Sequence, residues 1–112
     1  MSNAIARKLE SIQEKGAMRS IDVANLLGAR PETVSRWNQG KAFPRPDAQK
    51  NLLSLEYIID QLSDMYEPRE ARLWLFSRQK LLGGSSPANL IQEGKIDEVI
   101  EAVERLREGV FV

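Results

Sequence analysis

One stretch decides the fold of this chain: residues 20–39, SIDVANLLGARPETVSRWNQ. It predicts two short helices joined by the turn at residues 28–30, because Gly28 tolerates the positive φ that a sharp turn between helices requires. Ala24 is small at the point where two steeply crossed helices approach each other most closely. Apolar side chains are spaced to fill the angle between the helices: Val23, Leu27, Val34 and Trp37. The stretch therefore predicts a helix-turn-helix.

Hydrophobic spacing predicts helices on both sides of this stretch as well, and no segment alternates as a strand does. The signals expected to begin or end these helices are Ser20 and Ser86 as N-caps, Pro31, Pro68 and Pro87 in first turns, and Gly16, Gly40, Gly94 and Gly109 as stops. A linker with two prolines at residues 41–46 precedes the longest helix, expected over about residues 47–65. We predict an all-α protein of about seven helices.

The same pattern suggests three parts. We expect a helix-turn-helix DNA-binding lobe at residues 1–46, a connecting core helix at 47–66 and a small helical C-terminal domain at 67–112. Apolar residues in the connecting helix are spaced alternately by four and three: Ala48, Leu52, Leu55, Ile59, Leu62 and Tyr66. This row could be the seam of a dimer, but it spans less than three heptads, too few for an independent coiled coil. We favour a core helix clamped between two lobes.

The composition argues against an enzyme. Among 112 residues there is no histidine and no cysteine, which removes the commonest general base, the thiol nucleophile and the usual zinc ligands. The glycine- and serine-rich run at residues 83–86 lacks the Gly-Lys-Ser/Thr ending of a phosphate loop. We therefore expect no catalytic residues, no metal and no cofactor. We find neither an export leader nor an apolar stretch of about 20 residues that would predict membrane insertion. We therefore expect a cytoplasmic protein.

Formal neutrality conceals an uneven distribution of charge. The whole chain has 16 basic and 16 acidic side chains. Residues 1–50 carry nine basic and five acidic groups, a net charge of +4, whereas residues 51–112 carry seven and eleven, a net charge of −4. A basic half is typical of a nucleic-acid face when a motif accompanies it.

The helix-turn-helix supplies that motif and the candidate DNA contacts. An ordinary helical hairpin also favours Ala, Gly and Leu, but here the exposed side of the second helix is polar. The expected contacts with double-stranded operator DNA are Arg30, Glu32, Thr33, Ser35, Arg36, Asn38, Gln39, Lys41 and Arg45. Arg36 is the best candidate for guanine, because its guanidinium matches the O6 and N7 acceptors. Lys41 and Arg45 are expected on phosphates. One short helix reads few base pairs, so we also expect a homodimer.

Two segments resemble a known family. The run Val34-Ser-Arg-Trp-Asn-Gln-Gly-Lys41 resembles the Xre/Cro-like helix-turn-helix of bacterial regulators. Ala71-Arg-Leu-Trp-Leu75, Leu82-Gly-Gly84, Pro87, Leu90-Ile91, Gly94, Val99, Leu106 and Gly109 together resemble the toxin-binding domain of the Xre/MbcA/ParS antitoxins. This chain departs from the family at residues 76–81, where an Asn-Pro-containing loop is frequent.

The resemblance implies a function. It implies a non-catalytic antitoxin of a type II toxin–antitoxin system, a transcriptional repressor of its own operon that neutralises a RES-domain toxin, an enzyme that consumes NAD. Apolar Val110, Phe111 and Val112 after the expected stop at Gly109, with the face of Arg105 and Arg107, are our candidate toxin contacts. The alternative is a stand-alone helix-turn-helix transcriptional regulator whose C-terminal domain dimerises. A module that binds protein alone would not need the polar recognition helix.

Overall fold

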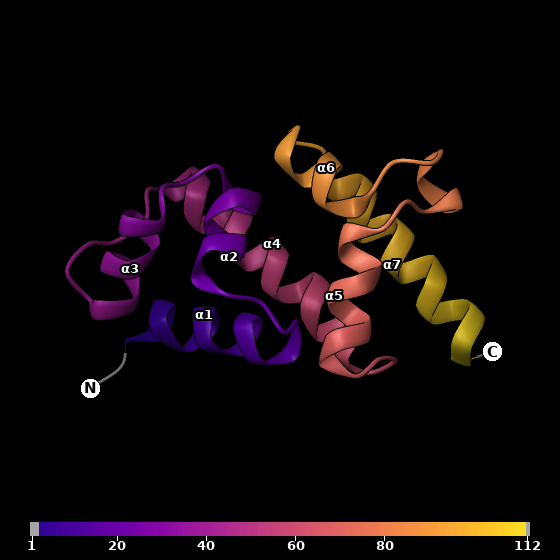
Figure 1. Cartoon of the computed structure of the whole chain (residues 1–112), viewed down its shortest axis with the longest axis horizontal. Helices are drawn as coiled ribbons and strands as arrows, with labels where there is room; N and C mark the ends of the chain where they lie inside the picture. The colour runs from indigo at the N-terminus through magenta and orange to yellow at the C-terminus, as the bar shows by residue number, and fades with distance from the viewer. Residues whose placement is uncertain (1–2, 112) are drawn as a thin grey trace.

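The computed structural model describes the backbone of residues 3–111 and the side chains of residues 3–109. Over this range the chain is helical and has no strand (Figure 1), which confirms the all-α prediction. The elements are α1 (Ala4–Lys15), α2 (Ser20–Leu27), α3 (Pro31–Gln39), α4 (Pro46–Ser63), α5 (Pro68–Phe76), the short 3-10 helix η1 (Lys80–Leu82), α6 (Pro87–Gln92) and α7 (Ile96–Phe111). Within the described part of the chain, no helix is both long and apolar enough to cross a membrane.

Proline and glycine set many of the helix boundaries as expected. Four helices begin at a proline, where the missing N–H removes no helical hydrogen bond. Gly28 (φ +67°) ends α2 and Gly40 (φ +75°) ends α3, both in the left-handed conformation that glycine adopts without strain. Ser86 caps α6, because its hydroxyl oxygen accepts a hydrogen bond from the Asn89 N–H at 3.1 Å.

Two predicted boundaries are wrong. Ser20 does not cap α2 but is its first residue, and Arg19 is the capping position. The side-chain contact at this end comes from Asp22, whose carboxylate accepts a hydrogen bond from the Arg19 N–H at 2.9 Å. Gly109 does not stop α7, which continues to Phe111. An isolated glycine only weakens a helix, and no following proline or turn signal ends this one.

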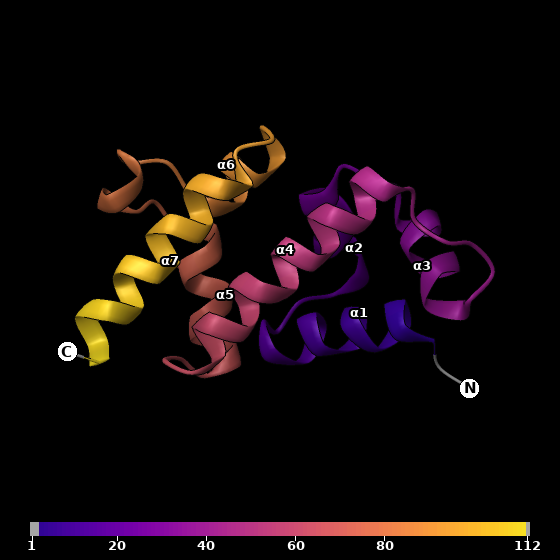
Figure 2. The ribbon, with the colours of Figure 1, turned by 180° about the vertical axis from the view of Figure 1, so that it is seen from behind.

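Helix α4 is the spine that joins the two ends of the molecule. Figures 1 and 2 show α1, α2 and α3 grouped at one end of α4 and α5, α6 and α7 at the other. The predicted apolar row lies inside: Leu52, Leu55, Ile59 and Leu62 are fully buried. One continuous core runs from α1 to α7. These four members of the row therefore face the core and are not available as a dimer seam, whereas Ala48 and Tyr66 at its ends are half-buried.

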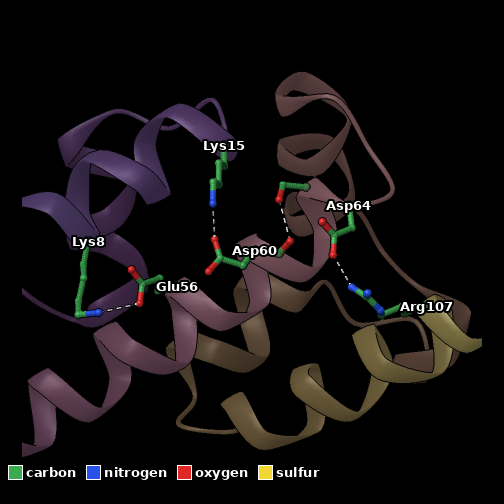
Figure 3. Close-up of polar contacts among 7 residues, drawn as sticks. Lys8, Lys15, Glu56, Asp60, Asp64 and Arg107 are labelled. Atoms are coloured by element: carbon green, nitrogen blue, oxygen red, sulfur yellow. Dashed lines mark hydrogen bonds and ion pairs between the residues drawn. The ribbon is translucent and has the colours of Figure 1, made fainter.

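Charged contacts line the solvent side of this spine (Figure 3). Lys8 and Lys15 of α1 pair with Glu56 and Asp60 of α4 at 3.0 and 2.8 Å. The hydrogen bond to Asp60 raises the pKa of Lys15. One turn beyond Asp60, at the C-terminal end of α4, Arg107 of α7 pairs with Asp64. Exposed pairs contribute at most about 1 kcal/mol each, so the buried core holds the helices together and the pairs help fix their register.

Candidate functional site

The recognition-helix side of the molecule carries an open groove between the start of α2 and the exposed face of α3. Its volume is about 700 Å³. The groove exists because Val34 and Trp37 turn the other face of α3 into the core, where they are 1% and 4% exposed. Gly28 and its turn then hold α2 and α3 at an angle that leaves their outer faces open. The geometry is that of a helix-turn-helix whose second helix, α3, exposes one face.

Four of the predicted DNA contacts line this groove: Glu32, Ser35, Arg36 and Gln39. The Gln39 amide donates a hydrogen bond to the Ser35 hydroxyl at 3.3 Å, so these two polar groups are held together on one ridge. Arg36 is exposed and belongs to the last turn of α3. The groove therefore presents a cation, a carboxylate and two neutral polar groups on one helix.

The other five predicted contacts lie outside the groove. Arg30 occupies the capping position at the start of α3, and Asn38, Lys41 and Arg45 are exposed around its end and in the linker to α4. Thr33 is half-buried. Arg30, Lys41 and Arg45 are thus exposed cations that flank the groove, whereas Arg36 lines it.

Three residues at the start of α2 complete the groove and were not predicted from the sequence: Arg19, Ser20 and Ile21. Ile21 is 45% exposed although it is large and apolar. Ser20 accepts a hydrogen bond from the Gln13 amide at 2.9 Å, which ties α2 to α1. The signal that could have found them is their place in the first turn of the first helix of the motif, which crosses the DNA backbone in helix-turn-helix complexes.

A partly buried ion pair joins the helix-turn-helix to the C-terminal helices, and it too was not predicted. Asp22 of α2 is only 8% exposed and accepts a hydrogen bond from Arg72 of α5 at 2.8 Å. Arg72 also donates to the Ala17 carbonyl at 3.2 Å, and its guanidinium lies 5.0 Å from the centre of the Phe76 ring. The hydrogen bond from Arg72 is the largest of the effects that lower the pKa of Asp22, so the carboxylate is held ionised.

Arg105 and Arg107, two of the predicted toxin contacts on α7, differ in their exposure and in their contacts. Arg105 is exposed and borders a hollow of about 370 Å³ between α7 and η1, whose other side holds Leu81 and Leu82. Arg107 is half-buried and donates to the Gln61 amide oxygen at 2.8 Å as well as to Asp64. Arg107 thus anchors α7 on α4. The side chains of Val110 and Phe111 and the whole of Val112 lie outside the described residues.

Two exposed apolar side chains on α5 and one on η1 extend this region: Leu73, Phe76 and Leu81, at 67%, 41% and 53% exposure. Their neighbours Trp74 and Leu75 are buried. A nine-residue helix with Leu, Trp, Leu and Phe in succession cannot bury all four, because successive residues point in different directions around the axis.

Comparison with known proteins finds one family of similar proteins. A family model described as the antitoxin Xre/MbcA/ParS C-terminal toxin-binding domain matches residues 61–109, from the end of α4 through most of α7. Over 110 residues the chain is 29% identical to the mycobacterial cidal antitoxin MbcA of Mycobacterium bovis, covering 98% of this chain and 97% of that one. The chain is thus similar to the Xre/MbcA/ParS antitoxins, through the family model at residues 61–109 and through the identity to MbcA over nearly its whole length.

Other members of the family agree. MbcA of Mycobacterium tuberculosis H37Rv matches to the same extent, and a second, probable mycobacterial cidal antitoxin of that strain is 29% identical over 92 residues, covering 82% of this chain and 78% of that one. A chain of the crystal structure of the M. tuberculosis MbcT–MbcA toxin–antitoxin complex has a TM-score of 0.82 at 29% identity, covering 98% of this chain and 99% of that chain. The family similarity therefore includes the helix-turn-helix.

Proposed function

We propose that this chain is the antitoxin of a type II toxin–antitoxin pair, which binds its toxin through the C-terminal helices and represses its own operon through α3. The observation that carries the proposal is the similarity to the antitoxin MbcA over 98% of the chain. The polar groove on α3 and the exposed apolar residues at the opposite end give the two activities separate surfaces.

The recognition helix offers contacts of two kinds. Arg36 and Glu32 in the groove match the hydrogen-bonding edges of guanine and cytosine, since a guanidinium donates to O6 and N7 and a carboxylate accepts from N4. Arg30, Lys41 and Arg45 flank the groove as exposed cations, which suits phosphates. The first group would read sequence and the second would set the affinity for any DNA.

Fluorescence anisotropy with labelled promoter DNA separates the two groups. Arg36→Ala is expected to weaken operator binding by about 1–3 kcal/mol and to relax the preference at one base pair. Lys41→Ala is expected to weaken operator and unrelated DNA alike, and to reduce the slope of log Kobs against log salt by about 0.9 if the lysine neutralises one phosphate. Unchanged operator affinity for Arg36→Ala would sink this assignment.

The proposed toxin is a RES-domain enzyme that consumes NAD, as the family resemblance implies. Its docking surface would comprise the end of α7 and the face that carries Arg105, with Val110, Phe111 and Val112 reaching into the toxin's substrate cleft. Arg107 would hold α7 in position for this contact, because its side chain donates hydrogen bonds to Gln61 and Asp64. A chain without histidine or cysteine fits the role of an antitoxin that is not itself catalytic.

Co-expression with the product of the adjacent gene tests the toxin-binding part. We expect that product alone to arrest growth, the full chain to restore growth and to co-purify with it, and a chain lacking residues 110–112 to lose neutralisation. Neutralisation by the truncated chain would exclude the tail as the inhibitory segment. A harmless neighbour that does not co-purify, combined with operator binding, would favour the stand-alone regulator.

A further inference from the structure

The linker between α3 and α4, residues 40–45, carries a large apolar side chain that the proposed DNA contacts leave out. Phe43 is 66% exposed and is the most exposed aromatic side chain in the part of the chain that the structure describes. The next residue, Pro44, is buried. Figures 1 and 2 show the linker beside α3, at the end of the molecule opposite α7. The linker therefore packs Pro44 inward and presents the Phe43 ring to solvent next to the recognition helix.

The backbone that carries Phe43 is held on both sides. Before it, the Lys41 N–H donates a hydrogen bond to the Arg36 carbonyl at 2.9 Å, which ties the linker to the last turn of α3. After it, the buried Pro44 leads to Arg45, which occupies the capping position of α4. Because the linker is already ordered, covering the ring with a ligand costs less conformational entropy than ordering a free loop would.

The sequence around this ring is positively charged. Residues 33–46 include three cations, Arg36, Lys41 and Arg45, and no carboxylate. Lys41 and Arg45 stand two residues before and two residues after Phe43; both are exposed, and neither makes an ion pair within the described residues. An apolar ring between two such cations suits a ligand with anionic groups on both sides of an apolar surface. The DNA backbone has this pattern, because its phosphates alternate with deoxyribose rings.

The length of α3 places the linker at the edge of the major groove of DNA. Its nine residues span about 14 Å, and the major groove is about 12 Å wide, so a helix lying across it ends at the phosphate strand that borders the minor groove. Phe43 follows Gly40 by three residues, at most about 10 Å of extended chain, which is enough to pass that strand.

We propose that Phe43 enters the minor groove beside the base pairs that α3 reads and packs there on deoxyribose, with Lys41 and Arg45 on the phosphates to either side. Phenylalanine is among the apolar side chains that DNA-binding proteins insert into the minor groove. This inference rests on the proposed function, since it requires that α3 binds DNA. It adds a contact outside the major groove, made by a residue that carries no charge and no hydrogen-bonding group.

Fluorescence anisotropy of the full chain with labelled DNA from its own promoter tests the contact. Phe43→Ala is expected to raise Kd by about 10–100-fold, the effect of no longer burying a phenylalanine ring. The slope of log Kobs against log salt should stay unchanged, because no charge is removed. Phe43→Tyr keeps the ring and should retain most of the affinity. Leu73→Ala, a matched change at 67% exposure on α5, should bind as wild type does.

Hydroxyl-radical footprinting on the same DNA locates the contact, because these radicals attack deoxyribose from the minor groove. Wild type should protect sugars that flank the base pairs read by α3, and Phe43→Ala at saturating concentration should lose that flanking protection alone. Undiminished affinity of Phe43→Ala, or unchanged flanking protection, would overturn the inference while leaving the proposed function intact. A weaker salt dependence would also overturn it, because the loss would then come from displaced cations. Promoter DNA that wild type itself does not bind would refute the proposed DNA binding, and this inference with it.

Discussion

Replacing Asp22 with alanine tests how the helix-turn-helix is attached to the C-terminal helices. The change removes the hydrogen bond from the Arg19 N–H at 2.9 Å and the one from Arg72 at 2.8 Å. Loss of the cap costs about 1 kcal/mol. Loss of the charged hydrogen bond costs about 1–2 kcal/mol after discounting for solvent, because the Arg72 side chain is 36% exposed. Asp22→Ala is therefore expected to lower the free energy of unfolding by about 2–3 kcal/mol.

Thermal unfolding followed by circular dichroism measures this effect. For a chain of this size about 1 kcal/mol corresponds to roughly 4 °C, so the expected fall in Tm is about 8–12 °C. Asp47→Ala is the matched control, since Asp47 is exposed in the first turn of α4, and it should change stability by less than about 0.5 kcal/mol.

A double-mutant cycle with Arg72→Met separates the pair from the cap. We expect the two single changes to be non-additive by about 1 kcal/mol, because each alone already removes the same hydrogen bond. Arg72→Met keeps an apolar side chain beside Phe76, over which the guanidinium now lies. Additive effects, or an Asp22→Ala variant as stable as wild type, would refute the claim that this pair joins the two ends of the molecule.

Three further predictions concern pH, glycine and the core. The pKa of Asp22 is lowered in the folded chain, so the ionised carboxylate stabilises the fold fully above its unfolded pKa of about 3.9, and this stabilisation is lost as pH falls through the folded value. The difference in Tm between wild type and Asp22→Asn should therefore shrink from pH 7 to pH 3. Gly28→Ala should destabilise by about 1–2 kcal/mol at φ +67°, whereas Gly109→Ala, within α7 and with open space at its Cβ, should stabilise by up to about 1 kcal/mol in urea unfolding. Leu55→Ala in the fully buried row should cost about 2–5 kcal/mol by the same measurement.

The sequence predicts those parts of the fold that local chemistry decides. Gly28 and Gly40 end helices because only glycine adopts their backbone conformation at no cost, and Ser86 caps α6 three residues before the N–H it binds. The apolar row of α4 was recognisable because its spacing of four and three residues repeats over residues 48–66, of which the central members from Leu52 to Leu62 are fully buried. Each of these signals acts within a few residues along the chain, where a single sequence carries the information.

The features that were missed depend on long-range packing. Asp22 and Arg72 are 50 residues apart, and nothing in either segment marks them as partners until α2 and α5 meet. Ser20 was predicted as the N-cap of α2 because serine is a favoured capping residue. The side chain that bonds the start of this helix belongs instead to Asp22. Leu53 is exposed because α1 and α7 cover other sides of α4. The spacing of apolar residues alone does not say how much of a helix its neighbours will cover.

Cellular NAD measured after induction tests the central claim most directly. We predict that the product of the adjacent gene, expressed alone, depletes NAD and stops growth, and that co-expression of this chain keeps NAD at the uninduced level. The chain lacking residues 110–112 serves as the matched control and is expected to leave NAD depleted. Equal depletion with and without the full-length chain, or a neighbour that leaves NAD unchanged, would contradict the account.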